Sequence, residues 1–410
     1  MPAMDLLVSG CRTSDVNLQF SPKWRCNFLH FYLQLLVFLL CNKYGKTYQD
    51  EKMRILHIMG SADYGGIPSV VYNYMTHIDR DKYHFDFALN TEPGDLGHEM
   101  MKMGASFYKL PLRSRGLKKY EDALTELLKS QHFDAIHVHS STTSYVDLRI
   151  ARKMGIKCRI AHAHTTPICS SAKSKLRKYS GWIFNRVYAT TMMACSKQAR
   201  NAVFGAWDWK TMILPNAIDT ERFRFNHETR HSIRKELGLE NKYVIGMVAS
   251  FSPLKNHRFA LEVFDELRKK DDSFMMVLVG DGPTYMSSIR YCAGHGLEKQ
   301  VLFLGKRQDP EIFYNAFDVC VFPSITEGFS IAGLEAITSG LPLMLSEQVP
   351  RELDFGEKVS YLPLEKSRWV DRLLTKPINF HREKAYKDVK EKGFDINDTA
   401  HLLEEIYRKR

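Results

Sequence analysis

The chain has 410 residues, a length that suits two or three domains of about 100–200 residues with well-filled cores. Its 44% hydrophobic and 26% charged residues are typical of a globular protein and exclude a disordered or collagen-like chain, and the lack of any run of about 18 apolar residues excludes a multi-span membrane protein. The eight cysteines form no C-x-x-C pair, so we expect reduced thiols in a cytoplasmic protein rather than a zinc ribbon or a disulfide framework.

The net charge of +11 is concentrated in one part of the chain. Residues 53–215 carry 23 Lys and Arg against 13 Asp and Glu, whereas residues 216–410 carry 29 against 30. Two dense basic segments, 109–119 and 173–186, contribute much of this excess. They form either a solvated surface or a surface for an anionic membrane or a phosphorylated substrate, and aromatic residues within the second segment favour an interface. No helix-turn-helix, zinc-finger or RNP pattern supports a nucleic-acid partner.

The first 52 residues differ in character from the rest. Residues 27–41 are apolar over about 14 positions, short for a membrane span but long enough for the core of a signal peptide. No A-x-A cleavage pattern follows them. Three hypotheses remain for residues 1–52: an extension translated from a mistaken start codon, a membrane-seeking anchor, or a structural helix.

From Met53 onward, apolar runs alternate with helix-like stretches such as 68–77 and 121–130, a pattern that predicts a parallel sheet covered on both faces. The runs that predict strands are RILHIMG, FDFALN, AIHVHS, RIAHAH and TMMACS, followed from near residue 242 by YVIGMVAS, FMMVLVG, VLFLG, VCVFPS and LPLMLS.

The predicted class is therefore α/β, with two Rossmann-like domains facing each other across a cleft. The first spans 53–215 and the second 242–377, and the turn-rich, charged residues 216–241 form a linker. Residues 378–410 are predicted to be helical and could lie across the domain junction. Ligands of such sheets bind beyond the carboxyl ends of the strands, so the residues that follow each strand are the candidates for a site.

After the first strand, Gly65 and Gly66 precede a helix predicted to begin near Pro68. Paired glycines let a ligand approach the backbone, and a helix N-terminus favours a phosphate; the alternative is a simple tight turn. The G-x-G-x-x-G spacing is missing, and no acidic residue ends the following strand, so a dinucleotide site is not expected here.

The second domain offers more specific candidates. Lys255 lies just past one strand end, and Glu327 and Glu335 are eight positions apart across a loop and a helix predicted to start near Ser330. Either glutamate alone is explained as a solvated charge or a helix-capping group. Together they suggest a site in which Glu335 accepts hydrogen bonds from ribose hydroxyls and Glu327 reaches a sugar. A diphosphate would face the free amides of the helix start, at Phe329, Ser330 and Ile331.

With these residues in place, residues 53 to about 407 resemble the retaining, GT-B-fold glycosyltransferases of family 4, especially bacterial capsular and exopolysaccharide enzymes. The matching segments are GGIPSVV, AHAHTTP, ACSKQAR, LPNAID, SPLKNH, VGDGP and FPSITEGFSIAGLEAITSGLP. The last contains the family's specific E-x7-E element, while the others are individually weak.

The resemblance implies a role for each candidate. Gly65 and Gly66 would contact the donor phosphate, Lys255 would clamp the diphosphate, and His164 would line the reaction centre. By the same resemblance, Glu327 would bind sugar hydroxyls and Glu335 would bind the donor ribose. The catalytic residues would be His164 and Glu327. Fixed cations and helix dipoles would then stabilise the departing nucleoside diphosphate without a metal or other cofactor.

One departure from the family pattern concerns the diphosphate clamp. The family usually has Gly-Arg where this chain has Ala249-Ser250, and loss of one charge-stabilising donor can lower a rate by about 10²–10³. The candidates to replace that arginine are Arg258, Lys306 and Arg307. The usual linker motif is also altered, to Asn216-Ala217-Ile218-Asp219, which is a milder change.

Two patterns suggest a metal without requiring one. Asp79-Arg80-Asp81 resembles the D-x-D element of other glycosyltransferases but falls in a polar joint between a helix and a strand. His137/His139 and His162/His164 are two H-x-H pairs, and alternate strand positions share a face, so a zinc site is conceivable. We expect strand-end histidines with separate roles instead, and no metal site.

The expected function is transfer of a sugar from a nucleotide-sugar donor to a saccharide or lipid-linked saccharide acceptor, with retention of anomeric configuration. The expected location is the inner face of the plasma membrane, where the basic first domain would contact anionic lipid. The alternative is a nucleotide-sugar-binding or scaffolding protein whose catalysis is impaired because Ser250 replaces the clamp arginine.

Overall fold

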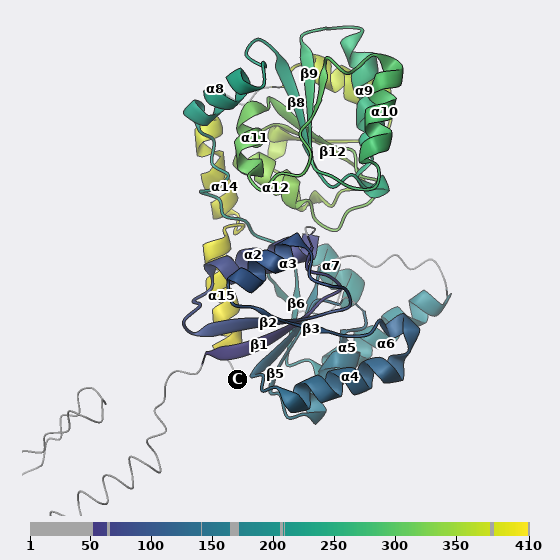
Figure 1. Ribbon diagram of the computed structural model, residues 1–410, viewed down its shortest axis with the longest axis vertical. Helices are drawn as coiled ribbons and strands as arrows, with labels where there is room; N and C mark the ends of the chain where they lie inside the picture. The colour runs from purple at the N-terminus through teal and green to yellow at the C-terminus, as the bar shows by residue number, and fades with distance from the viewer. Residues whose placement is uncertain are drawn as a thin grey trace, which may run out of the picture. The chain divides into compact units, whose positions relative to one another are not determined.

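The computed structural model describes residues 52–408 except 64–65, 141, 165–171, 206–207, 209 and 378–380, and of residues 172–177 it describes the backbone alone. The extension 1–51 and Gly65 therefore lie outside the described residues. From residue 52 onward the chain forms one compact unit with two parallel sheets (Figure 1).

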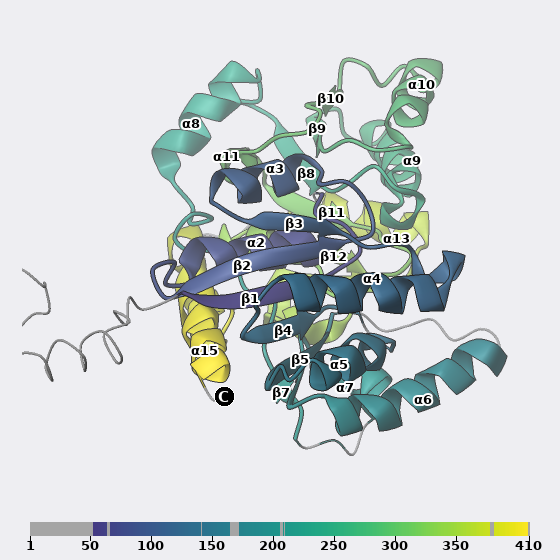
Figure 2. The same cartoon turned by 60° about the horizontal axis from the view of Figure 1, so that its bottom comes forward.

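The first sheet has, in the described residues, seven parallel strands in the order β3-β2-β1-β4-β5-β6-β7. The strands are β1 Met53–Ile58, β2 Tyr83–Leu89, β3 Ser106–Lys109, β4 Ala135–Val138, β5 Cys158–Ala163, β6 Thr191–Ala194 and β7 Met212–Ile213. The helices between them are α2 Gly66–His77, α3 Asp95–Lys102, α4 Leu117–Ser130, α5 Ser144–Lys153, α6 Ala172–Tyr188 and α7 Lys197–Val203, with the 3₁₀ turn η1 Arg113–Arg115. One face packs on α2, α3 and the C-terminal helix, and the other on α4, α5 and α7 (Figure 2).

The second sheet has six strands in the order β10-β9-β8-β11-β12-β13. The strands are β8 Tyr243–Val248, β9 Phe274–Val279, β10 Val301–Phe303, β11 Val319–Phe322, β12 Leu343–Ser346 and β13 Val359–Leu362. The helices are α8 His227–Glu236, α9 His257–Arg268, α10 Tyr285–His295, α11 Pro310–Ala316, α12 Ile331–Thr338, α13 Lys366–Leu374, α14 Ala385–Glu391 and α15 Ile396–Arg408. Short 3₁₀ turns are η2 Pro253–Lys255, η3 Arg351–Leu353, η4 Gly356–Lys358 and η5 Arg382–Lys384.

The strand order identifies where each sheet can bind a ligand. In both sheets the chain winds outward from β1 or β8 in one direction and then, from β4 or β11, in the other. This is the doubly wound order, in which ligands bind at the carboxyl ends of the two central strands, where the winding reverses. The predicted α/β class with two Rossmann-like domains is confirmed, and all ten predicted runs form strands.

The C-terminal segment connects the two domains. Helix α14 packs on α12 of the second domain, and α15 packs on α2 of the first. Between them, the chain pairs with the linker: the Ile218 amide donates to the Phe394 carbonyl (3.1 Å), and the Ile396 amide donates to the Ile218 carbonyl (2.9 Å). The C-terminal helices thus cross the junction, as expected, beside the linker.

Part of the predicted linker is helical. Residues 227–236 form α8, whose Arg230 and Arg234 donate to Asp318 and to the carbonyls of α11 and the residue after it, at 2.5–3.4 Å. The charged residues that suggested a loop therefore include two arginines that bind Asp318 and backbone carbonyls of the second domain. Among the described helices, none combines the length and apolar character needed to cross a membrane. The described cysteines, at 158, 195, 292 and 320, are buried.

We predict that Gly246→Ala destabilises the second domain. A Cβ at this β8 position would overlap the ring of Phe317, which is fully buried. Overpacking of this kind typically costs about 1–3 kcal/mol, so the urea midpoint of unfolding, followed by circular dichroism, should fall. The control is Gly294→Ala in α10, where a Cβ meets no atom within 4 Å and should stabilise the helix by about 0.5–1 kcal/mol. Equal stability of the two variants would contradict the packing.

Candidate active site

Lys255 and Glu327 meet where the winding of the second sheet reverses. Lys255 ends η2 after β8, Glu327 lies in the loop after β11, and β8 and β11 are neighbours in the sheet. The Ile325 amide donates to the Leu254 carbonyl (2.8 Å), which holds the two loops together. The Lys255 ammonium forms an ion pair with Oε1 of Glu327, whose side chain is only 8% exposed. The second oxygen of Glu327 is buried and has no partner among the described residues.

The loop that carries Lys255 is fixed by the residues after β9. The Phe251 amide donates to the Asp281 carbonyl (2.9 Å), and the Thr284 amide donates to the Phe251 carbonyl (2.9 Å). Gly282 has a φ of +151°, and a Cβ there would lie 2.7 Å from the Phe251 carbonyl oxygen. The glycine of the VGDGP segment is therefore required for the two loops to approach this closely.

The start of α12 supplies donors beside this pair. Ser330 is the N-cap, its hydroxyl accepting from the Gly333 amide (3.2 Å), so the helix starts at Ile331 as predicted. Amides of a first helical turn have no partner within the helix and carry partial positive charge, which suits a phosphate. Phe329 is buried against Phe394, and Ile331 is half-buried against the cores of both domains.

Glu335 lies just over one turn into α12 and accepts a hydrogen bond from the Tyr314 hydroxyl (2.8 Å). Its side chain is partly buried, and burial raises its pKa from 4.5 to about 7, against the opposing effects of Tyr314 and Arg222. Arg222 also forms an ion pair with Glu311 (2.8 Å). The carboxylate therefore has one oxygen occupied by Tyr314 and is poised to change charge near neutral pH.

The candidates of the first domain lie at the carboxyl ends of β1 and β5. Gly66 is the first residue of α2, two positions before the predicted start at Pro68, and it is exposed. His164 follows β5 and is buried, with Nε2 2.9 Å from Nδ1 of His139 and Nδ1 3.4 Å from Oδ1 of Asn216. Burial lowers the pKa of His164 to about 4, so the ring is neutral at physiological pH.

Sequence comparisons agree with this geometry. The family "Glycosyltransferase Family 4" matches residues 64–222, and "Glycosyl transferases group 1" matches residues 229–353. Together they span more than half of the chain. The chain is therefore a GT-B glycosyltransferase.

Individual relatives support the same assignment. The glycosyltransferase EpsF of Bacillus subtilis is 29% identical over 318 residues, covering 75% of this chain and 82% of EpsF. The UDP-Gal:alpha-D-GlcNAc-diphosphoundecaprenol alpha-1,3-galactosyltransferase of Escherichia coli is 27% identical over 314 residues, covering 72% of this chain and 80% of that enzyme. The crystal structure of Anabaena HepE in complex with UDP superposes with a TM-score of 0.73 and 18% identity, covering 87% of this chain and all of HepE, a likeness of fold.

The cations suggested as replacements for a clamp arginine all have other partners in this glycosyltransferase. Ser250 is exposed after β8. Arg258 donates to Glu262 (2.7 Å) and lies over the Tyr291 ring. Lys306 forms an ion pair with Asp95, and Arg307 donates to Asp309 at 3.0 and 3.1 Å. Lys255 is thus the cation that the described structure brings to the reversal point of the second sheet.

The D-x-D segment belongs to a turn. The Asp79 carboxylate accepts from the Lys82 ammonium (2.6 Å) and from the Asp81 amide (3.0 Å), between α2 and β2. This polar joint lies at the amino end of the strands, opposite the edge where ligands bind.

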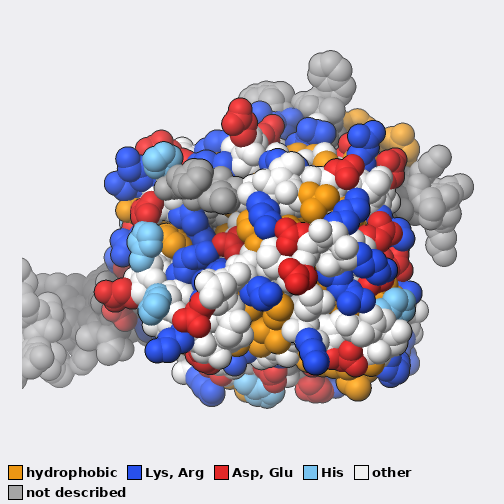
Figure 3. Space-filling model, turned by 90° about the horizontal axis from the view of Figure 1, so that it is seen from above, with side chains coloured by type: hydrophobic (Ala, Val, Ile, Leu, Met, Phe, Trp, Pro, Cys, Tyr) orange, Lys and Arg blue, Asp and Glu red, His pale blue; other side chains and the backbone are white. Residues whose placement is uncertain are grey.

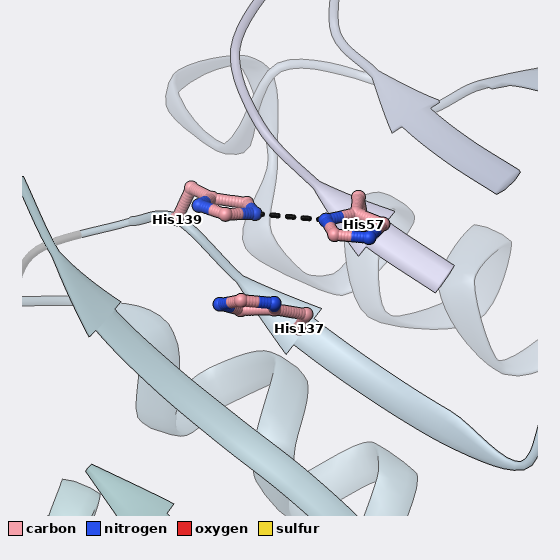
Figure 4. A group of neighbouring side chains, drawn as sticks. All are labelled: His57, His137 and His139. Atoms are coloured by element: carbon pink, nitrogen blue, oxygen red, sulfur yellow. Dashed lines mark hydrogen bonds between the residues drawn. The ribbon is translucent and has the colours of Figure 1, made fainter. Parts of the chain in front are cut away.

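The two H-x-H pairs come together with a fifth histidine that the sequence analysis did not identify, His57 of β1. Figure 4 shows His57 beside His137 and His139. His57 is paired in register with His137, and Nδ1 of His57 lies 3.0 Å from Nε2 of His139. The sequence does contain a signal that could have identified His57. It lies within the first strand, and that strand neighbours β4 in a doubly wound sheet.

We predict that Glu335→Gln stabilises the protein at pH 8 but has little effect at pH 5. Because the pKa of Glu335 is raised to about 7, the folded protein keeps a proton that the unfolded chain loses above pH 4.5, so stability falls as pH rises from 4.5 to 7. Glutamine avoids this cost, on the order of 2 kcal/mol at pH 8. Thermal unfolding at both pH values measures it.

The control for this prediction is Glu240→Gln, which alters an exposed carboxylate. It should leave the pH dependence of unfolding as in the wild type. A Glu335→Gln variant that is no more stable at pH 8 than at pH 5, relative to the wild type, would show that Glu335 is ionised in the folded protein well below pH 7.

Proposed function

We propose that this chain transfers a sugar from a nucleotide-sugar to a saccharide or lipid-linked saccharide acceptor in polysaccharide biosynthesis, with retention of anomeric configuration. The observation that carries the proposal is the Lys255–Glu327 pair, brought together at the reversal point of the second sheet beside the N-terminus of α12. A cation and helix amides in one place suit a diphosphate leaving group, and the partly unpaired carboxylate of Glu327 suits sugar hydroxyls.

The proposed roles follow the chemistry of each group. Lys255 and the α12 amides stabilise the negative charge that grows on the departing diphosphate, and a metal ion is not required for this. Glu335 accepts hydrogen bonds from the ribose through the oxygen that Tyr314 leaves available. In the first domain, Gly65 and Gly66 contact the phosphate, and His164 lines the reaction centre.

The acceptor class is inferred from chemistry shared with a relative. The acceptor in the name of the Escherichia coli relative is a sugar on diphosphoundecaprenol, a lipid-linked diphosphate. The net +10 of residues 53–215 suits such an acceptor and the anionic surface that holds it. The proposed location of the protein is therefore the inner face of the plasma membrane.

The experiment that tests the function is a turnover assay with UDP-, GDP- and ADP-sugars and a lipid-linked saccharide, with the product anomer determined by NMR. Transfer with retention supports the proposal. Binding of a nucleotide-sugar without transfer to any acceptor supports the alternative, a binding protein whose catalysis is impaired by Ser250. The observation that favours this alternative is that Arg258, Lys306 and Arg307 each have other partners.

We predict that Lys255→Ala weakens binding of the nucleoside diphosphate by about 10–100-fold, the effect of losing one charged hydrogen bond of about 1.5–3 kcal/mol. Binding of the free nucleoside should change little, because it has no phosphate for the ammonium to contact. Titration calorimetry with both ligands measures the difference. Lys269→Ala, which removes a cation paired with Asp265 on α9, is the control. Equal losses for both ligands would mean that Lys255 only supports its loop.

The exposed face of α6 supports the membrane part of the proposal. Tyr179, Ile183 and Val187 are spaced by four residues on one stripe of the helix and are 60%, 56% and 51% exposed. Tyr179 and Ile183 belong to the basic segment 173–186, and Val187 directly follows it. Viewed from above, the second domain instead mixes Lys and Arg with Asp and Glu over the visible face (Figure 3).

We predict that the full chain sediments with vesicles of phosphatidylglycerol and phosphatidylcholine at low salt. Raising the salt should weaken this binding, because the Debye length falls from about 10 Å at 0.1 M to about 3 Å at 1 M. Ile183→Asp with Val187→Asp should reduce binding at least about 10-fold, since two apolar anchors are replaced by charges that anionic lipid repels.

The matched control is Met286→Asp, which changes an exposed apolar residue of α10 in the second domain. It should sediment like the wild type. Salt-independent binding that persists in the Ile183→Asp, Val187→Asp variant would assign the anchor to residues 27–41 and contradict docking through α6.

A further inference from the structure

Five histidines lie on one face of the first sheet, at the carboxyl ends of its central strands. They come from β1, β4 and β5 and the residues just after these strands, and each is at most 5% exposed: His57, His137, His139, His162 and His164. Register aligns them, since His57 pairs with His137 across neighbouring strands and side chains two positions apart on a strand share a face. The sheet therefore buries five imidazoles in contact with one another, of which Figure 4 shows those of His57, His137 and His139.

The rings form two separate hydrogen-bonded series. In the first, Nδ1 of His57 lies 3.0 Å from Nε2 of His139, and Nδ1 of His139 lies 2.9 Å from Nε2 of His164. This series ends at Oδ1 of Asn216, 3.4 Å from Nδ1 of His164. In the second, His137 bonds to the Tyr407 hydroxyl of α15 (2.8 Å) and to His162 (3.2 Å).

A metal ion is the obvious alternative for such a cluster. Two sets of three histidines each place a ring nitrogen within 4.8 Å of the others. However, zinc bonds its ligands tetrahedrally at about 2.0–2.1 Å, so each ring must direct its lone pair at the ion rather than at a neighbouring nitrogen. The nitrogens of His57 and His139 are 3.0 Å apart in rings inclined by only 11°, which fits a shared proton.

The number of protons in the first series fixes its direction. Burial lowers the pKa of all three rings, to about 3 for His57, well below 6.5 for His139 and to about 4 for His164, so each neutral ring carries one proton. Two of the three protons form the two bonds between the rings. The third must lie at one end of the series, on Nε2 of His57 or on Nδ1 of His164.

The two ends differ in what surrounds them. Nε2 of His57 is buried and has no partner among the described residues, whereas Nδ1 of His164 faces the oxygen of Asn216. A buried N–H without an acceptor costs about 1–3 kcal/mol and is rarer in proteins than a buried acceptor without a donor. The third proton therefore belongs on Nδ1 of His164.

We propose that His139, supported by His57, is a positioning residue that fixes His164 as the Nδ1–H tautomer. His57 then donates to His139, His139 donates to Nε2 of His164, and His164 donates from Nδ1 toward Asn216. The ring presents a neutral hydrogen-bond donor at the carboxyl end of β5. This N–H suits an oxygen of the nucleotide-sugar. That oxygen would replace Oδ1 of Asn216, whose contact with Nδ1 of His164 is long, at 3.4 Å.

The link to catalysis rests on the proposed function, but the tautomer does not. The first measurement is therefore made on the ligand-free full chain labelled with [15N]histidine, by long-range 1H–15N NMR, which distinguishes the two neutral tautomers. The signal of His164 is identified by its loss in His164→Gln. We expect a protonated Nδ1 and a bare Nε2 in the wild type. An Nε2–H tautomer overturns the proposal, as does one equivalent of bound metal in elemental analysis of the purified protein.

His139→Leu removes the donor to Nε2 of His164 and should let the Nε2–H tautomer appear. The matched control is His137→Leu, two positions before His139 and on the same face but in the other series, which should keep His164 as Nδ1–H. The same result in both variants overturns the proposal. If His139→Leu does not fold, the wild-type spectrum and the spectrum of His57→Leu decide the question. In His57→Leu we expect His164 to keep its Nδ1–H tautomer, because His139 is still present.

Kinetics test the link to catalysis. In His139→Leu, kcat for sugar transfer should fall by about 10², the typical effect of losing one aligned donor, while KM for the nucleotide-sugar changes little. An unchanged kcat overturns this link. If the wild type transfers no sugar to any acceptor, the proposed function fails, and the NMR result still decides the tautomer.

Discussion

All paired strands in both sheets run parallel, and the position of each candidate residue depends on this constraint. Parallel strands end at the same edge of a sheet, and each crossover helix returns the chain to the opposite edge. Residues more than 70 positions apart, such as Lys255 and Glu327, or more than 80, such as His57 and His139, therefore meet at these edges. The hydrophobic cores on both faces keep these edges rigid, so that the buried polar groups stay in hydrogen-bonding positions although they have lost contact with water.

The fold was predictable because its strands are buried on both faces. Such strands consist of continuous apolar runs, and all ten predicted runs are strands in the structure. The strands that were not predicted, β3, β7 and β13, have only two to four residues and incompletely buried side chains, so they lack this signal. Helix α8 was missed because its hydrophilic arginines, which resemble those of a loop, are satisfied by Asp318 and by backbone carbonyls.

The candidate site was predictable only in part. Spacing along a strand shows which side chains share a face, but it does not show which residues of other strands they contact. The shared face of His162 and His164 follows from alternation, but their partners depend on register with β1 and β4. The start of α12 at Ile331 follows from Ser330 as a capping residue. The hydrogen bond from Tyr314 to Glu335, which joins α11 to α12, has no signature in the sequence.

The two sheet edges differ in their electrostatics, and this difference suits two steps of one reaction. At the second sheet, the Lys255 ammonium and the α12 amides are groups of the kind that stabilise a diphosphate, and the Glu327 carboxylate is of the kind that accepts hydrogen bonds from sugar hydroxyls. At the first sheet, five buried imidazoles are all held neutral, because burial lowers the pKa of each ring, and neighbouring histidines lower the pKa of His137, His139 and His162 further. A cation there would oppose positive charge developing on a sugar ring, whereas a neutral donor can orient a hydroxyl without that penalty. A chain of neutral imidazoles thus fixes the direction of a hydrogen bond without placing a positive charge near the sugar ring. A single lysine or protonated histidine at the same edge would bring that charge.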